Sequence, residues 1–283
     1  MKSLFKIFIF ITLSVTITAT YGQACTIAKC DTLVDTALYV MQNKMIIDGK
    51  LDEKHWQLMS KVKNINPFTP YSGPINDVTF GTLWNEKYFY VGVKVIDGTL
   101  NHKTGYKGGS YYPQYLDDAV ELFINPNKGH NLGRAMQFVQ AYNEINLYPA
   151  NAKNNGVLVK QTIITGGYSV EFAIPWDYFF PPEDRPGNPE KIFIGKRIGF
   201  DVSNDDDDAG QGTRQYQLVW NNKCDNNNYL ENFKYGTVVL SGESPVDIIA
   251  QENSIAGPAF LCATGTANYT VQPRKAIHIP GKQ

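Results

Sequence analysis

The sequence predicts an all-β protein, an antiparallel β-sandwich of jelly-roll or immunoglobulin-like form with a few short helices. Two observations favour this fold class. Short runs of alternating polar and apolar residues recur along the chain, separated by Gly, Pro and Asn turn signals, and sustained helical periodicity is scarce. Of the 283 residues, 43% are hydrophobic, which is enough for a substantial core.

Nine runs have strand character. The first two, 78–84 and 88–96, are separated by only three residues and therefore predict a hairpin. The other seven are 118–124, 136–142, 157–164, 168–174, 198–202, 215–220 and 235–240. Short helices are expected at 52–59 and 176–180. Many short strands with frequent turns are typical of a sandwich.

The first 22 residues have the pattern of a secretory signal peptide. Lys2 and Lys6 are followed by an apolar stretch without acids, and small residues precede the expected cleavage after Gly22. We therefore expect a secreted, extracellular or cell-surface protein, with the periplasm as an alternative. A lipoprotein anchored at Cys25 is a second alternative, although Gly22-Gln23-Ala24 fits a lipobox poorly.

The remaining chain divides into three parts. Residues 23–44 are expected to be a lead-in, 45–241 the sandwich, and 242–283 a tail or small β appendage. No membrane span is expected, because the N-terminal apolar run is short and interrupted by Thr.

Composition narrows the function classes. The net charge of -1 and the 19% of charged residues argue against a nucleic-acid partner, which requires a basic face. Aromatic residues make up 13% of the chain, with 17 Tyr among them. Tyrosine offers a flat apolar face and a polar tip, which suits the binding of polar, ring-shaped ligands.

In an exported protein the cysteines are disulfide candidates. There are four, Cys25, Cys30, Cys224 and Cys262, and the sequence does not choose among the three pairings.

Five blocks in order resemble family 9 carbohydrate-binding modules, which have a DOMON-like β-sandwich. Ile47 to Glu53 reads Ile-Asp-Gly-Lys-Leu-Asp-Glu and is followed by Trp56. The other blocks lie at 78–93, 118–124, 167–176 and 198–205, and Phe233-Lys-Tyr-Gly236 also fits. The resemblance covers roughly residues 45–241. It implies a non-catalytic module that binds a polysaccharide or oligosaccharide and supports carbohydrate catabolism by secreted glycoside hydrolases.

The resemblance also implies a binding site. Members of the family hold a sugar between two aromatic side chains, and those positions correspond to Tyr115 and Tyr229, tyrosines in place of tryptophans. Glu121 is the implied acceptor for sugar hydroxyls. The family's next strand carries an Arg and an Asn, which this chain lacks; Gln140 and Asn143 compensate only if the local register differs.

The acidic run Asp205, Asp206, Asp207 and Asp208 is a candidate metal site. Four adjacent carboxylates repel one another unless water, salt or a cation screens them, and Ca²⁺ prefers such oxygen ligands. The resemblance also suggests structural calcium, although no cofactor is required. The alternative is a solvated loop.

Two other functions remain as alternatives. One is a cell-surface structural or adhesion protein without sugar affinity. The other is an electron-transfer module with b-type haem held by Met136 and His130. Catalysis is not expected, because the sequence lacks a Gly-x-Ser-x-Gly elbow, a phosphate loop and His-Glu-x-x-His.

Overall fold

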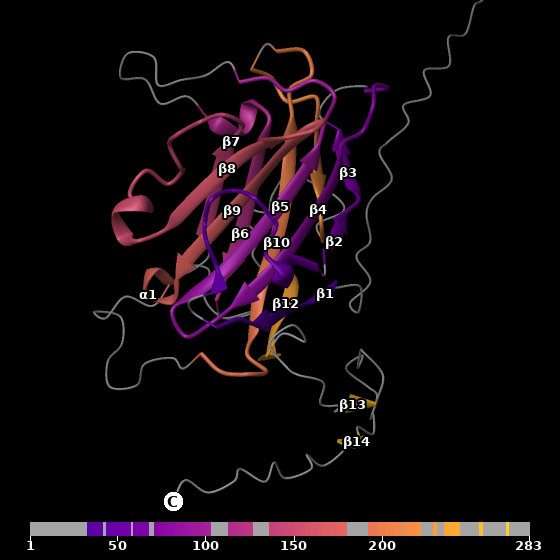
Figure 1. Cartoon of the computed structure of the whole chain (residues 1–283). Coiled ribbons are helices and arrows are strands. Elements are labelled where there is room, and N and C mark those ends of the chain that lie inside the picture. The colour runs from indigo at the N-terminus through magenta and orange to yellow at the C-terminus, as the bar shows by residue number, and fades with distance from the viewer. Residues whose placement is uncertain are drawn as a thin grey trace, which may run out of the picture.

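The computed structural model is a β-sandwich, as the sequence predicts (Figure 1). It describes residues 33–41, 44–57, 59–67, 71–102, 113–126, 136–179, 192–210, 212–221, 229–230, 235–243, 255–256 and 270–271. One layer runs β8-β9-β5-β4, with β2 and β1 beside β4, and the other contains β7-β6-β10-β11-β3. β12 pairs with β10 and with β1, so it joins the two layers along one edge.

The strands and helices have the following bounds. The strands are β1 (Val34–Tyr39), β2 (Ser60–Val62), β3 (Asn64–Pro67), β4 (Asp77–Trp84), β5 (Tyr88–Ile96), β6 (Ala119–Asn125), β7 (Met136–Ala141), β8 (Leu158–Ile164), β9 (Gly167–Pro175), β10 (Arg197–Asp206), β11 (Tyr216–Val219), β12 (Gly236–Glu243), β13 (Ile255–Ala256) and β14 (Thr270–Val271). The short helices are η2 (Lys54–Gln57), η3 (Gln114–Leu116), η5 (Lys153–Asn155) and α1 (Trp176–Phe179).

The strand β1 departs from the predicted pattern in two ways. It lies within the predicted lead-in 23–44, yet it is hydrogen-bonded into the sheet. It also runs parallel to both neighbours, β12 and β4, whereas the sequence predicts an antiparallel sandwich throughout. Its six residues carry no turn signal or clean alternation, so the pattern did not indicate a strand there.

The core forms where aromatic rings from the two layers meet. Phe200 of β10 lies with its ring centre 5.5 Å from that of Phe80 on β4 and 6.0 Å from that of Phe89 on β5. Trp56 and Trp84, which the sequence suggests as core anchors, are only 4% and 5% exposed. Burial of such large side chains from both layers is the main stabilising contribution to a sandwich.

The buried carboxylate of Glu171 holds the turn of the Ile47-Asp48-Gly49 block in place. Glu171 Oε2 of β9 accepts hydrogen bonds from the backbone N–H groups of Asp48 and Gly49 at 3.0 and 2.8 Å, and its Oε1 accepts one from Trp56 Nε1 at 3.0 Å. Gly49 has φ +90°, and a Cβ there would lie 2.6 Å from the carbonyl carbon of Gln161. Only glycine therefore fits the turn that brings these donors to Glu171.

Two short strands, β13 and β14, pair antiparallel as a separate small sheet in the predicted tail. All four cysteines lie outside the described residues. Within the part of the chain that the structure describes, no helix is long and apolar enough to span a membrane.

Burial raises the pKa of Glu171 to about 7, and this predicts a pH-dependent stability. The folded-state pKa of Glu171 lies above its ordinary value, so the protonated side chain favours the folded state. This contribution of Glu171 to the unfolding free energy is complete below about pH 4.5 and is lost as the pH rises through 7. Wild type should therefore lose about 2 kcal/mol of unfolding free energy relative to Glu171→Gln between pH 5 and pH 8. Urea unfolding at both pH values measures this, with the exposed Glu86→Gln as control. A difference between wild type and Glu171→Gln that does not change with pH would contradict the prediction.

Candidate functional site

A pocket of about 250 Å³ opens on the outer face of the layer that contains β6 and β7. Along β6, Val120 and Leu122 lie in the core, so the alternate residues Glu121 and Phe123 face outward. Segments far apart in the sequence complete the lining. The residues that line the pocket are Tyr115, Glu121, Phe123, Gln137, Arg214 and Tyr229.

The two tyrosines give the pocket aromatic surface. Tyr115 lies on η3, is half-buried and packs against the small buried cluster that includes Val139. Tyr229 follows β11 in the chain and is 57% exposed. Tyr115, Glu121 and Tyr229, which the sequence singles out, therefore line one pocket.

Charged and amide side chains form a hydrogen-bonded network at this pocket. Arg214 Nη1 lies 2.7 Å from Asp205 Oδ1 and 3.4 Å from Glu121 Oε1. Gln217 Nε2 donates to the same two oxygens, at 3.0 Å to Asp205 and 2.9 Å to Glu121. Gln137 Nε2 donates to the other oxygen of Glu121 at 2.5 Å. We call Glu121, Asp205 and Arg214 the pocket triad.

Electrostatics couple the triad to the aromatic surface. Burial, reinforced by the nearby Asp205, raises the pKa of Glu121 well above its ordinary value. The guanidinium carbon of Arg214 lies 4.9 Å from the centre of the Tyr115 ring, which is within the range of a cation–π contact. Arg214 therefore holds the two carboxyl groups and supports the Tyr115 ring at once.

Gln140 and Asn143 do not line this pocket. They line a separate depression of about 350 Å³ together with Glu144, Lys153 and other residues. The side chain of Gln140 is buried and donates to the carbonyl oxygens of Ala141 and Glu144 at 3.2 and 2.6 Å. The structure thus does not bring these two residues together with Tyr115 and Tyr229.

Sequence patterns did not indicate the lining residues Phe123, Gln137 and Arg214. They also did not indicate that Asp205 and Gln217 contact Glu121 or Arg214 next to the pocket. Arg214 and Glu121 are 93 positions apart, and a lone arginine in a turn gives no local signal. Asp205 and Gln217 lie side by side because of the register of β10 against β11. That register cannot be read from either strand alone.

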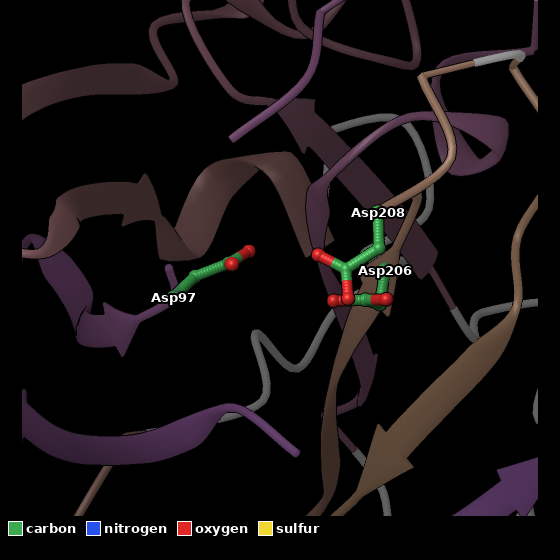
Figure 2. A group of neighbouring side chains, drawn as sticks. All are labelled: Asp97, Asp206 and Asp208. Carbon is green, nitrogen blue, oxygen red and sulfur yellow. The ribbon is translucent and has the colours of Figure 1, made fainter. Parts of the chain in front are cut away.

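A second polar cluster lies at the end of β10. It contains Asp97, which follows β5, Asp206, the last residue of β10, and Asp208 in the following turn. One oxygen from each residue lies within 4.8 Å of the others. Figure 2 shows Asp97 approaching Asp206 and Asp208 from its own segment of the chain. We call these three residues the aspartate cluster.

Hydrogen bonds only partly satisfy the aspartate cluster. Asn76 Nδ2 donates to Asp97 Oδ2 at 3.2 Å and to Asp206 Oδ1 at 2.9 Å, and the Tyr71 hydroxyl donates to Asp208 Oδ2 at 2.6 Å. Asp206 Oδ2 is buried and accepts no hydrogen bond in the described part of the molecule. Burial and the charges of Asp208 and Asp97 raise the pKa of Asp206 to about 7. Such convergent carboxylates suit a cation with oxygen ligands.

The acidic run is therefore divided between two places. Asp206 and Asp208 belong to the aspartate cluster, whereas Asp205 pairs with Arg214 and Asp207 Oδ2 accepts the backbone N–H of Gly212 at 2.7 Å. The alternative of a solvated loop is wrong, because Asp205, Asp206 and Asp207 are fully buried. Strand β10 continues to Asp206, so Asp205 and Asp206 belong to the sheet.

The haem alternative gains no support from the described residues. Met136 begins β7, and His130 lies outside the described residues.

Comparison with known proteins identifies the family. A family model described as "Carbohydrate family 9 binding domain-like" matches residues 47–243. The chain belongs to this family. It is thus a carbohydrate-binding module, as the resemblance in the sequence implies.

The curated relatives are much longer than this module. It is 27% identical over 216 residues to exoglucanase XynX of Acetivibrio thermocellus, an alignment that covers 74% of this chain and 17% of that protein. It is 29% identical over 206 residues to endo-1,4-beta-xylanase C of Paenibacillus barcinonensis, covering 71% and 17%. The module therefore corresponds to about a sixth of each relative.

Solved structures of the family share the fold. A family 9 module from Caldicellulosiruptor kristjanssonii in complex with cellotriose has a TM-score of 0.56 and 18% identity, covering 77% of this chain and 100% of that one. The same organism's module in complex with glucose gives 0.55 and 19%, covering 76% and 100%.

The pocket triad predicts a strong coupling between Arg214 and Asp205. Arg214→Gln leaves two buried carboxyl groups without their cation and should cost the module about 3 kcal/mol of unfolding free energy. Asp205→Asn in the same chain removes one of those charges and should restore at least 1 kcal/mol. A double-mutant cycle by denaturant unfolding measures the coupling. Strictly additive effects would show that the triad does not act as a unit.

Proposed function

We propose that this module binds the end of a polysaccharide or oligosaccharide in the pocket of Tyr115, Glu121 and Tyr229. The observation that carries the proposal is the convergence of these three residues, from η3, β6 and the segment after β11, on one pocket. A pyranose ring has an apolar C–H face and a fringe of hydroxyl groups. The tyrosine rings cover the face, and the Glu121 carboxyl accepts from the hydroxyls.

The solved relatives support this assignment. Both modules from Caldicellulosiruptor kristjanssonii are complexes with a glucose-based ligand, cellotriose or glucose. Gluco-oligosaccharides are therefore the first ligands to test, and xylo-oligosaccharides follow from the xylanases among the curated relatives.

We further propose that the module binds its ligand without cleaving it. Glycoside hydrolysis requires two carboxyl groups that flank the scissile bond. Glu121 and Asp205 instead share the donors Arg214 and Gln217 on one side of the pocket. Glu171 accepts hydrogen bonds from the backbone N–H of Gly49 and from Trp56 Nε1, so it stabilises the turn of the Ile-Asp-Gly block.

The biological setting that we propose is secretion and cooperation with glycoside hydrolases in carbohydrate catabolism. The signal-like N-terminus and the exoglucanase and xylanase relatives support it. A secreted binder of this kind holds an enzyme system at its insoluble substrate.

Calcium is a second proposal, carried by the aspartate cluster. Ca²⁺ would be held by Asp97, Asp206 and Asp208. Asp206 Oδ2 is buried and has no hydrogen-bond partner among the described residues, which fits a cation there. Its charge would offset the repulsion between Asp97, which follows β5, and the two aspartates at the end of β10, Asp206 and Asp208. The role is structural and lies outside the pocket lining.

Loss of either tyrosine should weaken sugar binding. Tyr115→Ala and Tyr229→Ala each remove one aromatic surface, and we expect at least a tenfold loss of affinity for cellotriose or xylotriose, about 1.4 kcal/mol, in isothermal titration calorimetry. Phe193→Ala is the matched control, because Phe193 is 55% exposed but lies outside the pocket. Wild-type affinity in both tyrosine variants would overturn the assignment. A folded wild type that binds neither soluble sugars nor polysaccharide would favour the structural or adhesion alternative.

Removal of calcium should destabilise the module. With Ca²⁺ at about 100 times its Kd the ion contributes about 2.7 kcal/mol, so EDTA should lower the Tm by about 5–10 °C. Asp206→Asn should lose most of this response, whereas Asp177→Asn on the exposed face of α1 should keep it. Thermal unfolding monitored by circular dichroism provides the measurement, and an unchanged Tm in EDTA would refute the calcium site.

A further inference from the structure

Buried acids outnumber buried bases among the described residues that line the pocket or contact its lining. Glu121 and Asp205 contribute two carboxyl groups, and Arg214 contributes one guanidinium. Glu121 is 2% exposed and Asp205 is fully buried, so solvent ions screen these charges weakly.

The donors at this site already point at the carboxyl groups. Arg214 Nη1 and Gln217 Nε2 each contact both Glu121 and Asp205, and Gln137 Nε2 is bonded to Glu121. A neutral sugar presents hydroxyl hydrogens, which such acceptor oxygens can bind. An anionic group instead requires donors, and it would have to displace these existing bonds.

We propose that the pocket triad selects ligands by charge, accepting the neutral end of a glycan and rejecting a uronic acid or sulfated sugar at the same position. This inference rests on the proposed function, because it concerns the same pocket. Asp205 acts as the specificity-determining residue. It does not line the pocket, yet it pairs with Arg214 at 2.7 Å, so that the one guanidinium group is shared between two carboxyl groups and does not balance both.

Paired titrations at pH 7 test the proposal with two ligands of the same shape, methyl β-D-glucopyranoside and methyl β-D-glucuronide. We expect wild type to bind the glucoside at least tenfold more tightly than the glucuronide. The ratio should persist in 0.5 M NaCl, because the charges responsible are buried.

Asp205→Asn should narrow that ratio at least threefold, since it removes the excess carboxyl group without changing the pocket lining. Asp177→Asn removes the same charge from the exposed face of α1 and should leave the ratio unchanged. If Asp205→Asn does not fold, Gln137→Lys replaces it, because the half-buried Gln137 lies on the pocket lining and a lysine there adds the missing cation.

The outcomes separate the inference from the proposed function. Equal binding of the two ligands by wild type, or tighter binding of the glucuronide, overturns the charge selection and leaves sugar binding intact. An unchanged ratio in a folded Asp205→Asn protein also overturns it. If the glucoside, cellotriose and xylotriose all fail to bind to wild type, the proposed function fails, and charge selection fails with it.

Discussion

The alternation of side chains along the end of β10 determines both polar sites of this molecule. Successive residues of a strand point to opposite faces. Asp205 therefore belongs to the pocket triad on one face, and Asp206 belongs to the aspartate cluster on the other. The register against β6 and β11 then fixes the partners, because it places Asp205 opposite Ala119 and Gln217. A slip of one residue would exchange the two faces and place a different residue of the run 204–208 at each site.

Burial gives these sites their chemical character. In water, four consecutive aspartates would be ordinary solvated acids. Here the fold takes three of them out of solvent. Asp205 is paired with Arg214 through Oδ1, and Asp207 accepts the backbone N–H of Gly212. Asp205 Oδ2 and Asp206 Oδ2 are both buried without a hydrogen-bond partner among the described residues. Burying a carboxylate is unfavourable unless a partner compensates it, so each such residue points to a partner in the protein or to a cation.

The sequence was sufficient for the sandwich and for three of the residues that line the pocket, because both depend on local patterns. Alternation located β4, β5, β6 and β9, and the blocks shared with family 9 modules located Tyr115, Glu121 and Tyr229. Arg214 could not be predicted in this way, since its role depends on a contact with Glu121 across 93 positions. The parallel strand β1 was missed for a related reason, because its place between β12 and β4 is decided by tertiary pairing and not by its own six residues.

The central claim is that the pocket, and not another depression of the surface, receives the sugar. A crystal structure of the protein soaked with cellotriose tests this most directly. The account predicts one glucose unit against Tyr115 and Tyr229, with a hydroxyl group within hydrogen-bond distance of Glu121. Cellotriose bound in the depression of Gln140 and Asn143, with the pocket of Tyr115 and Tyr229 empty, would contradict it.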